Sequence, residues 1–296
     1  MLRYLSILCL SILCVSCSCG NAKQSLHNRQ DRLIVSDNAS IQSRPQSTNK
    51  RESQEQSSLL EIPIVSKPLS SQILKRDGYV LSYNPDTRNC NWVAYELTRE
   101  EANGEILRDK NFYEDFAVAR PRATKDDYKG SGWSRGHMAP AGDMKWSENA
   151  MYQSCLFTNI CPQDASLNSG AWESVEKKCR SLAKQKGRVF IVCGPLYNGP
   201  IRTIGANNVR VPDSFFKVIL VPDGQSYSCV GFIFPNEPVA AAQKNEYAFC
   251  VDDVEKICGM DFFSKLPDTI ENDIESKISW SLVNYNTSVK IYLAKS

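Results

Sequence analysis

The chain has 296 residues, 42% of them apolar, and carries 35 Lys and Arg against 33 Asp and Glu. This length provides a stable core for one large or two small domains. The first 58 residues hold 7 of the basic and 4 of the acidic side chains, so the remainder is close to neutral. A near-neutral remainder excludes an overall basic surface, and any phosphate-binding field must therefore be local.

The N-terminus has the parts of an export signal. Arg3 precedes an apolar run that ends at Val15, and small residues follow. The run is too short for a membrane-spanning helix. Residues 13–17 resemble a bacterial lipoprotein cleavage site, with Cys17 as the lipidated residue and Cys19 as the substitute. We expect residues 1–16 to be a lipoprotein-type signal peptide; a plain cleaved signal and an uncleaved anchor are the alternatives.

Residues 17–58 are rich in Ser, Gln, Asn and Arg and contain almost no aromatic residues. Such a segment cannot bury enough apolar surface to offset the entropy lost on ordering. We predict a flexible polar tether here, or simply a disordered leader, and a folded domain over residues 59–296. The predicted location is the periplasm or the cell surface, with attachment to the membrane through lipid; secretion without an anchor is the alternative.

Eight of the 12 cysteines lie in the predicted domain. An even number of cysteines in an exported chain predicts disulfide bridges, although the pairing stays open. The domain has no Cys-x-x-Cys pair and a single histidine, which argues against a structural zinc site.

Several segments have the patterns of strands and helices. Aromatic and β-branched residues predict strands over residues 79–83 and 92–97, joined by a turn at 84–86. Residues 126–133 form a loop rich in Gly, Ser and Lys. Apolar residues at helical spacing follow Ser169, and Gly187 ends that helix.

The C-terminal half continues with strands before helices. An apolar run predicts a buried strand over residues 189–193, and residues 215–221 and 227–234 form a hairpin around a turn at 222–224. Helices begin near Asp252, ending at Gly259, and near Thr269. Strands followed by helices, without regular βαβ alternation, indicate an α+β fold with a central, mainly antiparallel β-sheet flanked by helices.

Three short motifs follow one another between residues 134 and 176. The first is Arg135-Gly136-His137-Met138-Ala139-Pro140, the second is Asn159-Ile160-Cys161-Pro162-Gln163, and the third runs from Asn168 through Gly170 and Trp172 to Glu176. The chain has two histidines, and His27 lies in the predicted tether. Any histidine chemistry of the folded part must therefore belong to His137.

These motifs resemble those of the DNA/RNA non-specific endonuclease family, a branch of the ββα-metal (His-Me finger) nucleases. Weaker similarity extends over most of residues 82–220. The resemblance implies a central sheet flanked by helices, with a ββα-metal finger that holds the metal. It also implies DNA and RNA as substrates and Mg²⁺ as the cofactor, with Mn²⁺ as a substitute, and it names no protein partner.

The resemblance also implies roles for individual residues. His137 corresponds to the general base, and a neutral imidazole suits that role near neutral pH. Asn168 corresponds to the metal ligand, because Mg²⁺ keeps most of its waters and needs few protein oxygens. An asparagine that caps the following helix is the alternative reading.

Further roles concern the surroundings of the metal and the phosphate. Glu176 lies two helical turns after Asn168, where its carboxylate can hold metal-bound waters; a solvated helix glutamate is the alternative. Asn159 supports the site by hydrogen bonding, and Arg135 stabilises phosphate charge. Arg108 aligns loosely as a second phosphate-binding arginine, with an ordinary surface arginine as the alternative.

One position departs from the family pattern. The family usually carries Asp where this chain has Ser134, and a hydroxyl replaces only part of what a carboxylate does. We therefore expect altered or reduced activity, not its loss. Trp133 and Trp172 are expected to pack in the core more than to stack on bases.

The sequence thus predicts an exported, magnesium-dependent endonuclease that cleaves DNA and RNA with little sequence preference. The main alternative is a surface nucleic-acid-binding lipoprotein whose nuclease site is weakened by changes such as Ser134. A phosphodiesterase that acts on another substrate is a further alternative.

The lipoprotein hypothesis predicts the effect of replacing Cys17. Cys17→Ser removes the thiol that accepts the lipid, so we expect the variant to leave the membrane fraction or to stay unprocessed. Membrane fractionation and lipid labelling measure this. Attachment and labelling that persist in the variant would show that Cys17 is not the lipidated residue.

Overall fold

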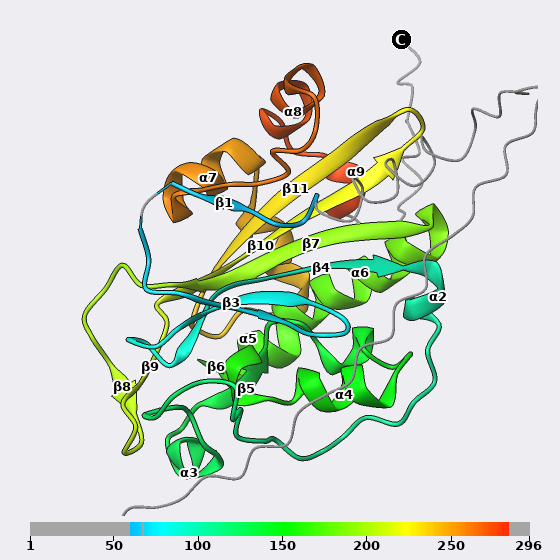
Figure 1. The fold of residues 1–296 in the computed structure, drawn as a ribbon. Helices are drawn as coiled ribbons and strands as arrows, with labels where there is room; N and C mark the ends of the chain where they lie inside the picture. The colour runs from blue at the N-terminus through cyan, green and yellow to red at the C-terminus, as the bar shows by residue number, and fades with distance from the viewer. Residues whose placement is uncertain (1–59, 67, 284–296) are drawn as a thin grey trace, which may run out of the picture. The chain divides into compact units, whose positions relative to one another are not determined.

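A seven-stranded antiparallel sheet organises the residues that the computed structural model describes, which are 60–66 and 68–283 (Figure 1). The predicted signal peptide and tether lie outside these residues. Across the sheet the strands are β12 (Ala248–Phe249), β11 (Ser226–Pro235), β10 (Ser214–Asp223), β7 (Arg188–Leu196), β4 (Asn89–Thr98), β3 (Val80–Asn84) and β2 (Gln72–Lys75).

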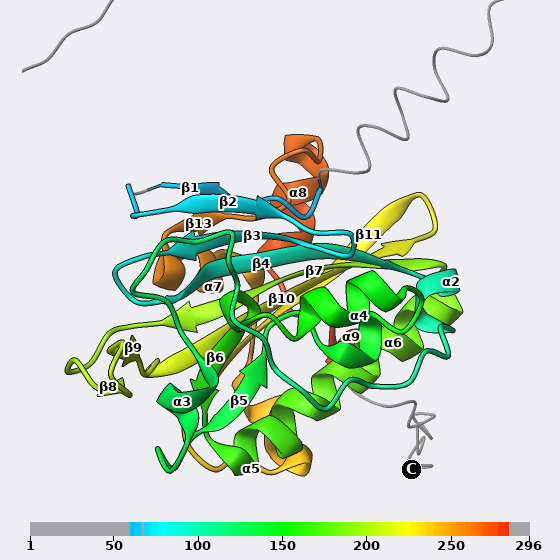
Figure 2. The ribbon, with the colours of Figure 1, turned by 60° about the horizontal axis from the view of Figure 1, so that its bottom comes forward.

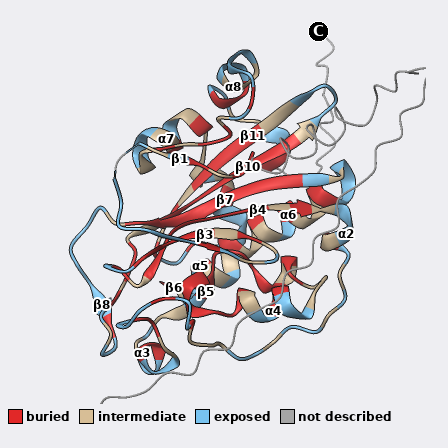
Figure 3. Cartoon of the chain, in the orientation of Figure 1, coloured by how far each residue is buried: buried red, intermediate tan, exposed pale blue. Residues whose placement is uncertain are grey.

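Side chains alternate between the two faces along the central strands. On β7, Ile191 and Cys193 belong to the apolar cluster that includes helix α6, whereas Phe190 and Val192 belong to the cluster that includes helix α7. This alternation is expected because successive strand residues point to opposite faces of a sheet. Apolar residues at consecutive positions therefore cover both faces, and Figure 3 shows these strands buried along most of their length.

The helices form a layer on each face (Figure 1). The first face carries α2 (Arg99–Ala102), α4 (Glu148–Ser154), α6 (Glu173–Lys186) and α9 (Trp280–Val283). The second face carries α7 (Val251–Cys258), α8 (Asp268–Glu275) and the small β1–β13 sheet, made of Ile64–Val65 and Met260–Asp261.

Shorter elements complete the described part. They are α3 (Lys125–Tyr128), β5 (Ser134–His137), β6 (Ile160–Gln163), α5 (Ala165–Leu167), the β8–β9 ribbon (Thr203–Ile204 and Val209–Arg210), a π-helical turn (Asn168–Trp172) and 3₁₀ turns at Ala141–Asp143, Phe157–Asn159 and Ala241–Tyr247. No helix among the described residues is long and apolar enough to cross a membrane.

The predicted α+β class with a central antiparallel sheet is confirmed. The two helix stops are confirmed as well: Gly187 has φ 98° after α6, and Gly259 has φ 68° after α7. These are left-handed conformations that glycine adopts without steric cost. The predicted hairpin is β10–β11, in which Asp223 pairs with Ser226 across the turn.

Two predicted boundaries are wrong. The segment 126–133 is not a loop throughout, because its first residues belong to helix α3. The helix predicted to start at Ser169 begins as a regular α-helix only at Glu173, because a π-helical turn precedes it. Both errors come from backbone geometry that apolar periodicity does not encode.

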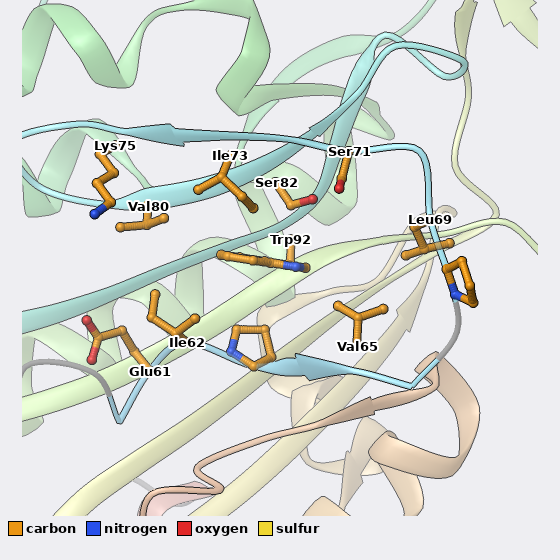
Figure 4. Close-up of a pocket in the computed structure, with 12 residues that line it drawn as sticks. Glu61, Ile62, Val65, Leu69, Ser71, Ile73, Lys75, Val80, Ser82 and Trp92 are labelled. Carbon is orange, nitrogen blue, oxygen red and sulfur yellow. The ribbon is translucent and has the colours of Figure 1, made fainter. Parts of the chain in front are cut away.

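A pocket of about 630 Å³ opens on the second face, between the segment leading into β1 and strands β2 and β3 (Figure 4). Figure 4 shows Trp92 at its centre, with Ile62 and Val65 on one side and Ile73 on the other. Its lining is mostly apolar and contains no histidine. This pocket contains none of the residues of the three motifs.

The prediction of disulfide bridges is wrong for the described residues. All eight in the described residues are free thiols, and six of them are buried. Cys90 and Cys161 come close enough to share a hydrogen bond, yet they too are unbonded. Most of these residues fill space in the core as small apolar side chains, a use of cysteine that an even count cannot distinguish from bridging.

The free thiols make a countable prediction. Burial raises the pKa of Cys179 and of Cys193 to about 12, so these sulfurs stay protonated and resist oxidation in the folded protein. We expect protein purified without reductant, cleared of residues 1–58 and denatured, to show eight reactive thiols. Counting fewer would demonstrate a bridge that this structure lacks.

Candidate active site

Strands β5 and β6 place the first motif beside the second. They pair antiparallel, with Arg135 opposite Pro162 and His137 opposite Ile160, and Figure 2 shows the pair close to α5. Gly136 permits this approach, because a Cβ atom there would lie 2.2 Å from Oε1 of Gln163. A glycine between the arginine and the histidine is therefore a packing requirement.

The third motif begins in the π-helical turn. Within it Gly170 has φ −104° and ψ −109°, and the Ala171 amide donates to the Val239 carbonyl at 3.1 Å. These angles are not helical, so the chain is kinked at Gly170. The turn replaces the regular α-helical spacing expected between Asn168 and Glu176.

The first and third motifs and a distant segment meet in one pocket of about 210 Å³, here called the histidine pocket. It brings together four of the predicted residues, namely Arg108, His137, Asn168 and Glu176. Glu173 and Arg180 also line it. The loose alignment of Arg108 therefore led to a side chain that lies at the site.

A second pocket of about 510 Å³, here called the lysine groove, adjoins the first because Asn168 lines both. Its lining is Phe112, Lys125, Tyr128, Lys129, Trp133, Ser134, Arg135 and Asn168. Three of these side chains are cationic and none is acidic. A local positive field of this kind is what the near-neutral composition requires for phosphate binding.

His137 is held in place from several sides. Its carbonyl accepts a hydrogen bond from Nε1 of Trp172 at 3.2 Å, and its ring packs against Phe112 with centroids 5.2 Å apart. The residue is 6% exposed, and Nε2 has no hydrogen-bond partner within the described residues. Burial, together with the charges of the nearby Arg108 and Arg135, lowers the pKa of His137 to about 3. The imidazole is therefore neutral and able to accept a proton.

Asn159 contributes by positioning and does not line either pocket. Its Oδ1 accepts from the Ala139 amide at 2.9 Å, and its Nδ2 donates to the carbonyls of Ala139 and Ser154 at 2.8 Å each. The side chain is fully buried. These bonds hold the backbone that immediately follows His137.

Asn168 is not the helix cap that the alternative reading requires. Asp164 caps the N-terminus of α5, because its Oδ1 accepts from the amides of Ser166 and Leu167. The N-cap of α6 is Trp172, and Asn168 lies at the C-terminal end of α5 with helical angles, φ −55° and ψ −47°. Its side chain lines both pockets.

The oxygen donors of the histidine pocket suit a hard cation. The amide of Asn168 and the carboxylates of Glu173 and Glu176 line the same space. Magnesium prefers oxygen ligands and retains several waters, so one direct protein ligand with carboxylates behind it is sufficient. Burial raises the pKa of Glu176 to about 7, which the charges of Lys217 and Arg180 oppose. A cation in the pocket would favour the ionised carboxylate.

Sequence reasoning missed the charged groups that surround Glu176. Lys217 of β10 is fully buried, and its Nζ lies 4.1 Å from the centre of the Trp172 ring. Asp143 pairs with Arg180 at 2.6 Å and accepts a hydrogen bond from the Tyr95 hydroxyl at 2.9 Å. The sequence did mark Lys217, because it is a single charged residue inside an apolar strand. A charged side chain is rarely tolerated in a core position without a partner.

The comparisons with known proteins identify the family of the chain. A model of the DNA/RNA non-specific endonuclease family matches residues 56–269. The chain belongs to this family. It is 37% identical to the mitochondrial Endonuclease G of Homo sapiens over 209 residues, which cover 66% of this chain and 70% of that protein.

Two further matches place the chain within the family. It is 37% identical to Nuclease C1 of Cunninghamella echinulata var. echinulata over 212 residues, covering 65% of this chain and 83% of that nuclease. A solved structure of an EndoG/EndoGI complex superposes with a TM-score of 0.65 at 28% identity, covering 69% of this chain and 90% of that chain. The resemblance and the ββα-metal fold are thereby confirmed, and family membership supports a nuclease that acts as a hydrolase.

The lowered pKa of His137 predicts how stability depends on pH. Between pH 6.5 and about 3 the unfolded chain binds a proton that the folded chain does not, so the free energy of unfolding falls as the pH falls through this window. The loss approaches about 1.4 kcal/mol per pH unit. Urea unfolding of the wild type and of His137→Ala between pH 7 and 4 measures it. Equal slopes for the two proteins would contradict a buried neutral histidine.

Proposed function

We propose that the protein is a metal-dependent endonuclease that hydrolyses phosphodiester bonds of DNA and RNA with little sequence preference. One observation carries the proposal: His137, Asn168, Glu176 and Arg108 line a single pocket that adjoins a cationic groove. Membership of the endonuclease family supports the same chemistry.

His137 acts as the general base. Its neutral imidazole accepts a proton from the attacking water, and the rigid backbone on both sides fixes where the ring points. General-base assistance of this kind contributes about 10²–10⁴-fold to the rate. A ring held neutral by burial needs no prior deprotonation at physiological pH.

Two arginines bind the phosphate that is cleaved. Arg108 lines the histidine pocket, and Arg135 lines the lysine groove with its guanidinium carbon 4.5 Å above the centre of the Phe112 ring. Both side chains are exposed and so remain available to substrate. Guanidinium groups match phosphate oxygens in bidentate geometry, which favours a role in stabilising the charge that grows on the phosphate.

Asn168 would hold the metal ion directly, and Glu176 and Glu173 would hold its waters. Mg²⁺, or Mn²⁺ in its place, would supply Lewis-acid stabilisation of charge on the phosphate oxygens. Lys217 keeps a positive charge near Glu176 and so favours the ionised form of that carboxylate.

The lining of the groove explains the proposed lack of sequence preference. Lys125, Lys129 and Arg135 offer charges that contact phosphates, which are the same in every sequence. Trp172 is fully buried against Phe215 and Lys217 and cannot stack on a base. Trp133 is only half-buried in the groove, where it can contact substrate.

Ser134 motivates the alternative, a surface lipoprotein that binds nucleic acid through a weakened site. It lies in the lysine groove, outside the histidine pocket. The residues proposed for base, metal and phosphate contacts are all present without it. We therefore favour an enzyme that cleaves nucleic acid over a protein that only binds it. We also propose export with a lipid anchor, since export separates such an activity from the cell's own nucleic acid.

The test compares plasmid DNA and RNA cleavage by the wild type, His137→Ala and Asn168→Ala, with magnesium and with chelator. We expect the wild type to cleave both substrates only with metal. His137→Ala should lose at least about 10²-fold at every magnesium concentration, because the base is absent. Asn168→Ala should recover part of its activity in excess magnesium, because it lacks only a ligand.

The outcomes separate the candidate functions. Full activity of His137→Ala, or equal rescue of both variants by magnesium, would contradict the proposed division of roles. Tight binding of DNA without any metal-dependent cleavage by the wild type would support the binding lipoprotein instead. Cleavage restricted to a small diester would point to a different phosphodiesterase.

A further inference from the structure

Three carboxylates converge on the second face of the sheet, away from the histidine pocket. Asp252 and Glu255 come from α7, and Glu275 is the last residue of α8. One oxygen from each lies within 4.8 Å of the other two. These three residues are called the carboxylate cluster below, and Figure 1 shows α7 and α8 on the side of the sheet opposite α6.

Glu275 distinguishes this cluster from ordinary surface acids. The residue is 3% exposed, and its Oε1 is buried without a hydrogen-bond partner among the described residues. It also stands at the C-terminal end of α8, where the helix dipole disfavours a negative charge. Burying a carboxylate without a partner costs free energy. Glu275 also lies beside two further carboxylates, and this arrangement indicates that a positively charged partner is missing.

No side chain in the described part of the chain supplies that partner through an ion pair. The neighbouring lysines pair elsewhere: Lys256 with Asp253 at 2.9 Å, and Lys277 with Asp273 at 2.8 Å. Glu255 accepts one hydrogen bond, from the Phe262 amide at 2.7 Å. That bond leaves the other carboxylate oxygens of the cluster available.

Two more acids increase the negative charge around the cluster. Asp261 of β13 and Glu271 of α8 both raise the pKa of Glu275, after burial as the largest cause, and it reaches about 9. Burial and the same neighbours raise the pKa of Glu255 to about 7.

We propose that Asp252, Glu255 and Glu275 form a binding site for a divalent cation, Ca²⁺, that ties α7 to α8. All donors are carboxylate oxygens, which hard cations prefer. Calcium tolerates irregular geometry and takes several ligands at 2.3–2.6 Å, whereas magnesium demands a near-ideal octahedron. Three ligands from two helices fit the more flexible ion, whose role here is structural.

The site is independent of the proposed catalytic metal. Its ligands belong to elements packed in the second apolar cluster with Phe262 and Ile274, whereas Asn168 lies on the opposite side of the sheet beside the first. The ion would cross-link two helices that are close in sequence and both contact β11. Its binding is therefore expected to change stability and not the chemistry of cleavage.

Thermal unfolding of the full chain, cleared of metal and then titrated with calcium chloride, tests the proposal. We expect the melting temperature to rise by about 5–10 °C when calcium is 100-fold above its dissociation constant. Asn168→Ala should keep the whole rise, because it removes the other metal site. Glu275→Gln should lose the rise, and Asp273→Asn, an exposed acid on the same helix, is the matched control that should keep it.

Three results would overturn the proposal: no calcium-dependent rise in the wild type, a rise that survives in Glu275→Gln, or a rise that Asn168→Ala abolishes. Glu275→Gln replaces a buried carboxyl group that faces two other carboxylates by a neutral amide of similar size, so in chelator it should melt at least as high as the wild type. If that variant nevertheless fails to fold, Asp252→Asn takes its place with the same expectation. Calorimetric titration adds stoichiometry: one calcium ion fewer should bind to the cluster variant than to the wild type.

Discussion

The geometry of the candidate active site depends on the way Asn159 holds the backbone after His137. One buried amide makes three hydrogen bonds, two to Ala139 and one to Ser154. They fix the end of β5 against the segment that leads into β6, while the contact of Gly136 with Gln163 sets how close the strands come. A general base must keep its geometry to within a fraction of an ångström, and hydrogen bonds between buried groups would provide this for His137 in its proposed role.

Charged groups of both signs lie close together around Glu176. Lys217 comes from the sheet, Glu176 from α6, and the Asp143–Arg180 ion pair is near enough to affect the pKa of Glu176. Low dielectric strengthens each of these interactions. His137, in contrast, has arginines nearby and stays neutral. The pocket thus holds an uncharged histidine beside carboxylates, which is the combination that the proposed base and the proposed cation would need.

Much of the fold was predictable because local chemistry decides it. Apolar runs marked β7 and β10, and Gly187 and Gly259 ended their helices where the chain required a left-handed residue. The site was predictable in its motifs, His137 and Asn168 above all. The π-helical turn was not, because it depends on the contact of Gly170 with the Val239 carbonyl, a residue far along the chain.

Other features could not be predicted because they depend on tertiary contacts between residues that are distant in the sequence. Lys217 is a lone charge in an apolar strand, and its meaning appears only when the sheet sets it beside Trp172. The eight cysteines suggested bridges by number, yet the sheet distributes most of them through the core as apolar fillers. The same central strands, buried on both faces, separate the proposed catalytic pocket from the proposed cation site. The buried neutral His137 lies on one face, and Glu275, whose Oε1 has no hydrogen-bond partner among the described residues, lies on the other. The two proposals therefore assign catalysis and stability to opposite faces of the sheet.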